Sequence, residues 1–460
     1  MTMRLLLSPR TIGVAAAAAA VLVSAACHKT PAAPPPAPIP LTDSAVAAIA
    51  WVESNATGFT PDDSTTANAS ERAKLYQITS GARVIGFSEL VEGTHELPYI
   101  MRRALLALAD SGVRGIALQA SMADAMEIDR YVRSGKGDLR RLLPLLNPPE
   151  SQRISTRETA ALIEALRAWN LSHPTKQIGF YGFEIPTAAH AVHIITSLPD
   201  SVLGAPLKTW LTQRYACVAR NEGAHWGLEG RAADSTFWAS CGPETTAAMD
   251  SVIALHQRSA RHGAELAYAE QAARLIQHHV RVGLARLTRH DGNAEHVLYL
   301  LDQLGPGGRL VLWGGDVEAG RLTLDRTTVQ TGVPLGQKLG AAYRAIAFTV
   351  GDGRVRARVP RQNGRGGNGP PDISDAQLLP PQHNTFEDAF IRTSPAGFWL
   401  DMRSLPNDVG GAYLKGPRSM RLITELYVGL LANQFETPMQ FPTNYDAVLF
   451  VKHATPAHRY

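Results

Sequence analysis

The chain has 460 residues, of which 45% are apolar and 19% charged, with a formal net charge of +4. This ordinary globular mixture excludes a disordered chain, a collagen and a coiled coil. The charge is too small to indicate a nucleic-acid-binding surface, and three cysteines are too few for a disulfide-built scaffold. The length allows more than one domain, although large α/β domains reach this size alone.

The first residues have the order of features that marks a secretory signal. Arg4 and Arg10 give a positively charged start, and Thr11 to Val23 is an apolar, alanine-rich stretch. Three small residues then precede Cys27, which resembles a bacterial lipobox. The apolar stretch is too short to span a membrane. We therefore expect a lipoprotein signal peptide over residues 1–27, with a plain secreted protein cut nearby as the alternative.

We predict that Cys27 is lipidated and tethers the mature protein to the cell envelope. Residues 28–40 are so rich in proline that they stay extended and form no core, as a tether requires. His28 after the cysteine favours the outer membrane, facing the periplasm, if the host has two membranes. Metabolic labelling with a palmitate analogue tests this prediction, and label that persists in Cys27→Ala would contradict it.

An alternation of helices and strands follows this leader. Helical spacing of apolar residues and short apolar runs predict, in chain order, a helix over 41–51, a strand over 83–87, a helix over 96–109, a strand over 115–119, helices over 123–132 and 156–169, a strand over 177–183, a long helical region over 251–287, a helix over 293–304, strands over 309–313 and 343–350, and late strands over 396–401 and 447–451. Residues 353–381 are rich in Gly, Pro and Arg and predict a mobile insertion.

Strands that alternate with helices imply a parallel sheet covered on both faces. We expect a three-layer α/β/α fold with a mainly parallel sheet and a helical insertion at about residues 200–290. Residues 28–70 would form the tether with an N-terminal helix and loop, and residues 71–460 one domain. In such folds the functional residues follow the carboxyl ends of the strands.

Two cysteines remain once Cys27 is assigned to the lipid, namely Cys217 and Cys241. An exported protein meets an oxidising compartment, in which a disulfide can form. We expect these two cysteines to pair, with two unpaired thiols as the alternative.

The segments after the predicted strands are similar, in order and spacing, to motifs of the erythromycin esterase-like family. Residues 84–96, VIGFSELVEGTHE, resemble the opening strand of the family and its G-E-x-T-H-G-x-H-E motif. Residues 116–120 resemble its A-x-E-x strand, residues 180–184 its F-Y-G-F-D segment, and residues 401–403 its late D-L-R. The resemblance covers roughly residues 81–451 and implies a three-layer α/β/α core. It also implies hydrolysis of a macrolactone ester by activated water, with an opening-motif histidine as general base and no covalent intermediate.

Several residues differ from that family pattern. Read without gaps, the sequence has Glu92 where the family has its catalytic histidine, although it retains the first motif glutamate as Glu89. Glu184 stands where the family has an aspartate. The H-N-x-H segment becomes Gly315-Asp316-Val317-Glu318, so both of its histidines are absent. A register shifted by three residues would instead make His95 the motif histidine.

The strand-end acids are the candidates for chemistry. Carboxylates crowded together raise one another's pKa, so one could serve as a general base near neutral pH. They could instead bind Ca²⁺ or Mg²⁺, or be solvated acids paired with nearby arginines. The candidate catalytic residues are Glu89, Glu92, His95, Glu184, Asp316 and Glu318.

The same resemblance indicates which residues would hold a substrate. The family's arginine in the next helix falls beside Arg102 and Arg103, and the glutamate of its second strand becomes Gln119. Trp313, at the end of a predicted strand, would line the pocket. No resident cofactor or metal is expected. His190 and His193 have the spacing of metal ligands, but no third ligand is evident in the sequence around them.

Two functions are consistent with these observations. The chain could be an erythromycin esterase-like hydrolase that acts on an ester or macrolactone through activated water. It could instead be a catalytically degenerate lipoprotein that binds a small molecule, a metal or haem. Both have a small-molecule ligand, neither binds nucleic acid, and the expected membrane contact is the N-terminal lipid anchor. The sequence does not name the substrate or a protein partner.

Overall fold

The computed structural model describes residues 40–64, 66–146, 154–184, 188–219, 235–259, 261–284, 287–324, 328–362, 368–424 and 426–460. The chain divides into two units after Leu41, and the second, Thr42–Tyr460, is compact and holds the fold described below. Cys27 and the rest of the predicted signal peptide lie outside the described residues. Within the described residues, no helix has the length and apolar character needed to cross a membrane.

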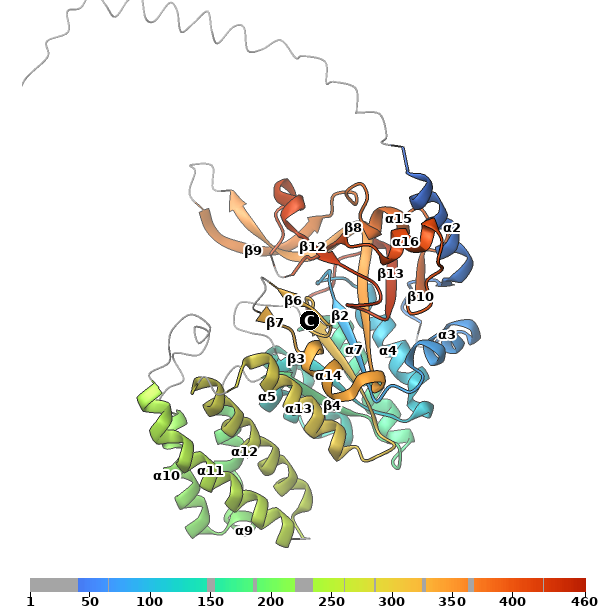
Figure 1. Cartoon of the computed structure of the whole chain (residues 1–460). Helices are drawn as coiled ribbons and strands as arrows, with labels where there is room; N and C mark the ends of the chain where they lie inside the picture. Colours follow the sequence, from blue (N-terminus) through green and yellow to red (C-terminus); the bar gives the residue numbers. More distant parts are fainter. Residues whose placement is uncertain are drawn as a thin grey trace, which may run out of the picture. The chain divides into compact units, whose positions relative to one another are not determined.

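A nine-stranded sheet forms the centre of the second unit (Figure 1), with the order β1-β10-β13-β8-β2-β5-β3-β4 and with β9 paired to β8. The strands are β1 (Thr57–Phe59), β2 (Val84–Glu89), β3 (Val113–Ser121), β4 (Gly179–Glu184), β5 (Arg309–Gly315), β8 (Tyr343–Gln362), β9 (Asn368–Gln377), β10 (Gly397–Asp401) and β13 (Ala447–Ala454). All pairs from β13 to β4 are parallel, whereas β1, β9 and β10 pair antiparallel. The predicted α/β class with a mainly parallel sheet is confirmed.

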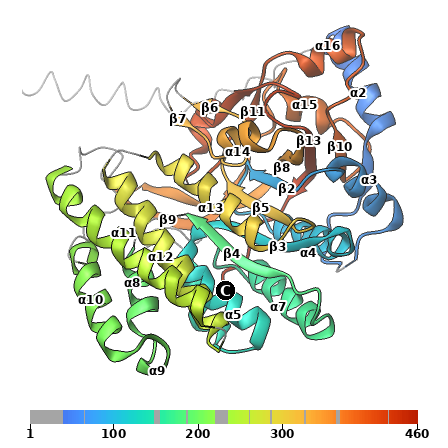
Figure 2. The same cartoon turned by 60° about the horizontal axis from the view of Figure 1, so that its bottom comes forward.

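The crossover helices lie on the two faces of the sheet. The chain moves in one direction along the sheet through α4 (Glu96–Leu108), α5 (Met122–Ser134) and α7 (Arg157–Ser172). It returns in the opposite direction through α13 (Arg289–Gln303) and α14 (Gly332–Leu339). α4 and α5 both contact α7, and α13 contacts α14, with the two sets on opposite sides of the strands (Figure 2). The strands between them are buried, and β2 is buried at every position.

The helical insertion lies between β4 and α13. It comprises α8 (Ala189–Thr196), α9 (Asp200–Leu203), α10 (Ala205–Ala219), α11 (Ser235–Arg258) and α12 (Gly263–Gly283). The long helical region expected over 251–287 therefore contains the end of α11 and the whole of α12, and these two helices pack against each other. Cys217 of α10 and Cys241 of α11 form a disulfide, with Cα atoms 5.8 Å apart.

Removing this disulfide should destabilise the insertion. The bond closes a loop with a sequence separation of 24 residues, and constraint of the unfolded chain by a loop of that size contributes about 3–4 kcal/mol. We expect Cys217→Ser/Cys241→Ser to lower the free energy of unfolding by up to that amount in urea denaturation. Titration of the denatured, unreduced wild-type protein should find neither of these thiols, and two reactive thiols would contradict the pairing.

Two segments differ from the sequence-based expectation. Residues 353–381, expected to be a mobile insertion, include the paired parts of β8 and β9, which run antiparallel from Arg354↔Gln377 to Gln362↔Asn368. The N-terminal segment, expected to lie outside the domain, forms α2 (Asp43–Asn55), which contacts α16, and β1, which pairs with β10. Shorter elements complete the unit: α3 (Ala69–Thr79), α6 (Leu139–Leu142), β6 (Thr323–Leu324), β7 (Thr328–Val329), α15 (Phe386–Phe390), α16 (Val409–Lys415), β11 (Arg418–Arg421) and β12 (Glu436–Met439).

Candidate active site

The connections of the sheet change sides at the carboxyl end of β5. The chain leaves β2 and β3 toward the face that carries α4, α5 and α7. It leaves β5, which lies between those two strands, toward α14 on the other face. Ligands bind in α/β sheets beyond strand ends where neighbouring connections diverge in this way. The residues that end β2, β5, β3 and β4 are therefore the candidates for a functional site.

Gln119, near the end of β3, links β3 to both neighbouring strands. Its side-chain oxygen accepts a hydrogen bond of 2.7 Å from the backbone N–H of Gly315 at the end of β5. Its amide nitrogen donates to Oε1 of Glu184 at the end of β4, over 3.0 Å. The same carboxylate oxygen accepts a hydrogen bond from the guanidinium of Arg289, the first residue of α13. The structure thus joins two of the predicted residues with an arginine that the sequence did not indicate.

Glu318 lies in the turn after β5 and is paired with a histidine. Nδ1 of His290, the second residue of α13, donates to Oε1 of Glu318 over 3.1 Å. The hydroxyl of Thr331, just before α14, donates to the same oxygen. Glu318 is 2% exposed. A Cβ at Gly314 would lie 2.8 Å from the Cβ of Glu318, so glycine is required where the carboxylate folds back over the strand end.

The surroundings of Glu318 keep its buried carboxylate ionised. Burial by itself would raise the pKa of Glu318. The hydrogen bond from His290, the charge of that ring when protonated and the charge of Arg289 together hold the pKa below its ordinary value. Glu318 is therefore ionised at neutral pH and accepts the Nδ1 proton of His290. A carboxylate that orients a histidine in this way prepares it for proton transfer.

The first turn of α13 positions both new residues. The side chain of Thr288 accepts a hydrogen bond of 3.1 Å from the backbone N–H of Asp291, which is a favourable helix start. The helix therefore begins at Arg289 rather than at residue 293, the expected start. The N-terminus of a helix favours negative charge beside it, and two carboxylates lie there, those of Glu184 and Glu318.

Glu89 ends β2 beside a tryptophan of β5. Nε1 of Trp313 donates to Oε2 of Glu89 over 2.9 Å, and both residues are buried. In the turn that follows β5, Asp316 has a φ of +55° and accepts the N–H of Val317 at 2.7 Å. Glu89, like Glu184 and Glu318, receives a hydrogen bond from an N–H donor.

Glu92 and His95, the alternatives for the motif histidine, lie in the turn between β2 and α4. Glu92 is buried, and its backbone N–H donates to the carbonyl of Ile423 at 2.8 Å. His95 directly precedes α4, and its Nδ1 lies 2.8 Å from Oε1 of Glu158. Its Nε2 lies 2.7 Å from Oδ1 of Asp63, so both ring nitrogens have a carboxylate partner.

These partners prevent His95 from acting as a general base at neutral pH. The hydrogen bond to Glu158 outweighs burial and, together with Asp63, raises the pKa of His95 to about 9. Burial by itself would raise the pKa of Glu158. The hydrogen bonds from His95 and His458 together outweigh burial and lower this pKa to about 2. A ring that holds its proton at pH 7 cannot accept one from water. This state argues against the shifted register, in which His95 would be the catalytic histidine.

The structure does not bring Arg102 and Arg103 to the strand ends. Arg103 is buried on α4, where its Nε bonds to Oε1 of Glu71 of α3 at 3.1 Å and its Nη1 to Oγ of Ser64 at 3.0 Å. Arg102 donates to the backbone carbonyl of Asp63. Both arginines hold α4 to residues 60–64 and to α3, which gives them a structural role, and substrate binding by them stays a prediction.

Comparisons with known proteins place this site in a family context. The sequence model of a family described as erythromycin esterase matches residues 108–454. No curated protein gives a significant match. A crystal structure of a Bacillus cereus protein is 17% identical with a TM-score of 0.74, and it matches 92% of this chain and 100% of its own.

Two further solved structures share the fold. One is a succinoglycan biosynthesis protein, 15% identical with a TM-score of 0.71, aligned over 92% of this chain and 100% of its own. The other is a histidine-to-asparagine variant of the erythromycin esterase EreC in its open conformation. It is 13% identical with a TM-score of 0.54, over 85% of this chain and 95% of its own. At these identities the similarity establishes the fold and not the reaction.

Proposed function

Since this chain belongs to the erythromycin esterase family, a hydrolase-like family, we propose that it hydrolyses an ester or lactone with water activated by His290. The observation that carries this proposal is the His290–Glu318 pair at the carboxyl end of β5. Glu318 belongs to the segment in which the family's H-N-x-H histidines are absent. Helix α13 thus supplies, from another part of the chain, an imidazole at the position where the strand-end segment lacks one.

In the proposed reaction, Nε2 of His290 takes a proton from water while the water oxygen adds to the ester carbonyl carbon. Glu318 stays ionised and stabilises the resulting imidazolium. Arg289, whose charge already acts on Glu318, supplies positive charge for the oxyanion of the tetrahedral intermediate. Collapse then breaks the bond to the alcohol oxygen, which takes the proton from the imidazolium. Ester and water become acid and alcohol, without a covalent enzyme intermediate.

The remaining strand-end residues position these groups. Thr331 and Glu318 hold the Nδ1 side of His290. Glu184 holds the guanidinium of Arg289, and Gln119 in turn ties Glu184 to β5. In the proposed reaction Gln119 and Glu184 therefore have a positioning role, rather than a role as base.

Erythromycin should be hydrolysed little or not at all. Three polar features of the family site are altered together, with Glu92 for histidine, Gln119 for glutamate and the 315–318 segment for H-N-x-H. Loss of one general base costs about 10²- to 10⁴-fold, and the proposed base stands on α13 instead of in the opening motif. Mass spectrometry of erythromycin incubated with the purified protein tests this, and ring-opened product formed at about 1 s⁻¹ or faster would contradict it.

A panel of simple esters and lactones tests the proposed function itself. Wild-type protein should release acid and alcohol from at least one of them, and Glu318→Gln should slow that release. Binding of panel compounds without turnover in any of them would instead favour the degenerate ligand-binding lipoprotein. We also propose that the protein acts at the cell envelope, held by the lipid on Cys27, for which the leader described above is the support.

A further inference from the structure

A second side-chain cluster joins three distant parts of the chain. His95 precedes α4, Glu158 lies in the first turn of α7, and His458 belongs to the C-terminal segment after β13. One ligand atom from each of these residues lies within 4.8 Å of the others. The Nδ1 atoms of His95 and His458 lie 2.8 and 2.7 Å from the same oxygen of Glu158.

We propose that His95, Glu158 and His458 bind a Zn²⁺ ion. Two imidazoles and one carboxylate are a ligand set that zinc takes, with bonds of about 2.0–2.2 Å. Tetrahedral bonds of that length separate ligand atoms by about 3.3 Å, and the three ligand atoms here lie within 4.8 Å of one another. The side chain of His458 is 58% exposed, so it can make the small outward movement that the ion requires.

The surroundings of the cluster already orient its ligands. The other ring nitrogen of His95 bonds to Oδ1 of Asp63, and zinc-bound histidines usually have such a carboxylate partner. Glu158 is 1% exposed and also accepts the backbone N–H of His458 at 3.1 Å. Backbone bridges on both sides of His458 hold the C-terminal segment against the β2–α4 turn and the start of α7. The ion would therefore close a three-way contact that the backbone has already assembled.

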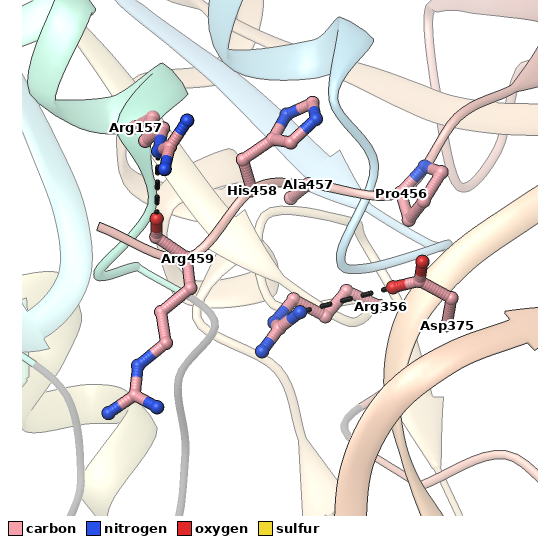
Figure 3. A pocket seen from close by; sticks show the side chains of 7 residues that line it. All are labelled: Arg157, Arg356, Asp375, Pro456, Ala457, His458 and Arg459. Atoms are coloured by element: carbon pink, nitrogen blue, oxygen red, sulfur yellow. Dashed lines mark hydrogen bonds and ion pairs between the residues drawn. The ribbon is translucent and has the colours of Figure 1, made fainter.

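His458 also lines a pocket of about 200 Å³ (Figure 3). Three protein ligands leave a tetrahedral ion one open position, and His458 belongs both to the ligand set and to the pocket wall. Arg157 and Arg356 line the same pocket, in which Arg356 pairs with Asp375 at 3.9 Å. The full lining is Arg157, Arg356, Asp375, Pro456, Ala457, His458 and Arg459.

Calorimetric titration of the full chain with Zn²⁺ tests the proposal. The protein is prepared without a histidine tag, and a chelator first removes any bound metal. The titration is done at pH 8, because protons compete less with Zn²⁺ for the imidazole rings there than at neutral pH. We expect one saturable site in the wild type. His458→Ala should weaken binding by more than about 100-fold, because loss of an outer-shell partner alone costs about 10- to 100-fold. Asp63→Ala, which removes such a partner, should cost about 10-fold.

The matched control is His453→Ala. His453 lies on β13, is 66% exposed and pairs with Asp352, outside the cluster. The His453→Ala protein should bind Zn²⁺ like the wild type. Co²⁺ in place of Zn²⁺ should give the visible absorption of a tetrahedral site in the wild type and in His453→Ala, and should lose it in His458→Ala.

Absence of a saturable site in the wild type, or equal binding by wild type and His458→Ala, would overturn the proposal. Because His458 is exposed, its removal should not unfold the chain, and circular dichroism of each variant checks this. The titration requires no turnover, so its outcome is independent of ester hydrolysis.

Discussion

Replacing His290 with asparagine should lower kcat on the best ester substrate by about 10²- to 10⁴-fold, the contribution of a general base. Asparagine keeps a hydrogen-bond donor near Glu318 but has no nitrogen that can take a proton from water. KM should change little, because His290 is proposed to stabilise the transition state and not to bind the substrate. Steady-state kinetics of wild type and variant on that ester measure both quantities.

The control for this substitution is His190→Asn. His190 also lies on a helix and pairs with a carboxylate, that of Asp124, but it belongs to the helical insertion. The His190→Asn protein should retain wild-type kcat and KM. If His290→Asn kept full activity while Glu92→Gln lost it, the base would be the motif carboxylate and the His290 proposal would be wrong.

Replacing Arg103 with methionine should lower the free energy of unfolding by about 3–5 kcal/mol, the cost of breaking a buried ion pair. Arg103 and Glu71 are each 2% exposed, and the distance between Nε and Oε1 is 3.1 Å. Methionine keeps most of the apolar stem and leaves the Glu71 carboxylate buried without its cation. Urea denaturation compares the variant with the wild type.

Two variants make this result specific. Arg72→Met removes an exposed arginine from α3 and should change stability by less than about 0.5 kcal/mol. Glu71→Gln/Arg103→Met removes both charges, keeps an acceptor for the indole N–H of Trp399 and should recover part of the loss. If Arg103→Met unfolded like wild type but lost ester turnover, the substrate-binding role suggested by sequence would be correct and the structural role wrong.

The architecture was accessible from sequence because its signals are local. Short apolar runs bounded by turns predicted β2, β3, β4 and β5, and helical spacing predicted α4, α5 and α7. Alternation of the two implied the parallel sheet, and the rule for strand ends directed attention to Glu89, Gln119, Glu184 and Glu318. The same local reasoning missed the β8–β9 pairing, because Gly, Pro and Arg obscure strand periodicity in residues 353–381.

The side-chain pairs on which the proposals and the Arg103 prediction depend were decided by tertiary structure alone. His290 is 28 residues from Glu318 along the chain, Arg103 is 32 from Glu71, and His458 is 300 from Glu158. No periodicity links such positions, because each pair depends on which helix a crossover lays against which strand end. The sequence by itself therefore determined the α/β class, the helical insertion and the edge of the sheet where chemistry is expected. Only the packing of α13, α4 and the C-terminal segment decided that His290 meets Glu318, that Arg103 meets Glu71, and that His95, Glu158 and His458 lie together.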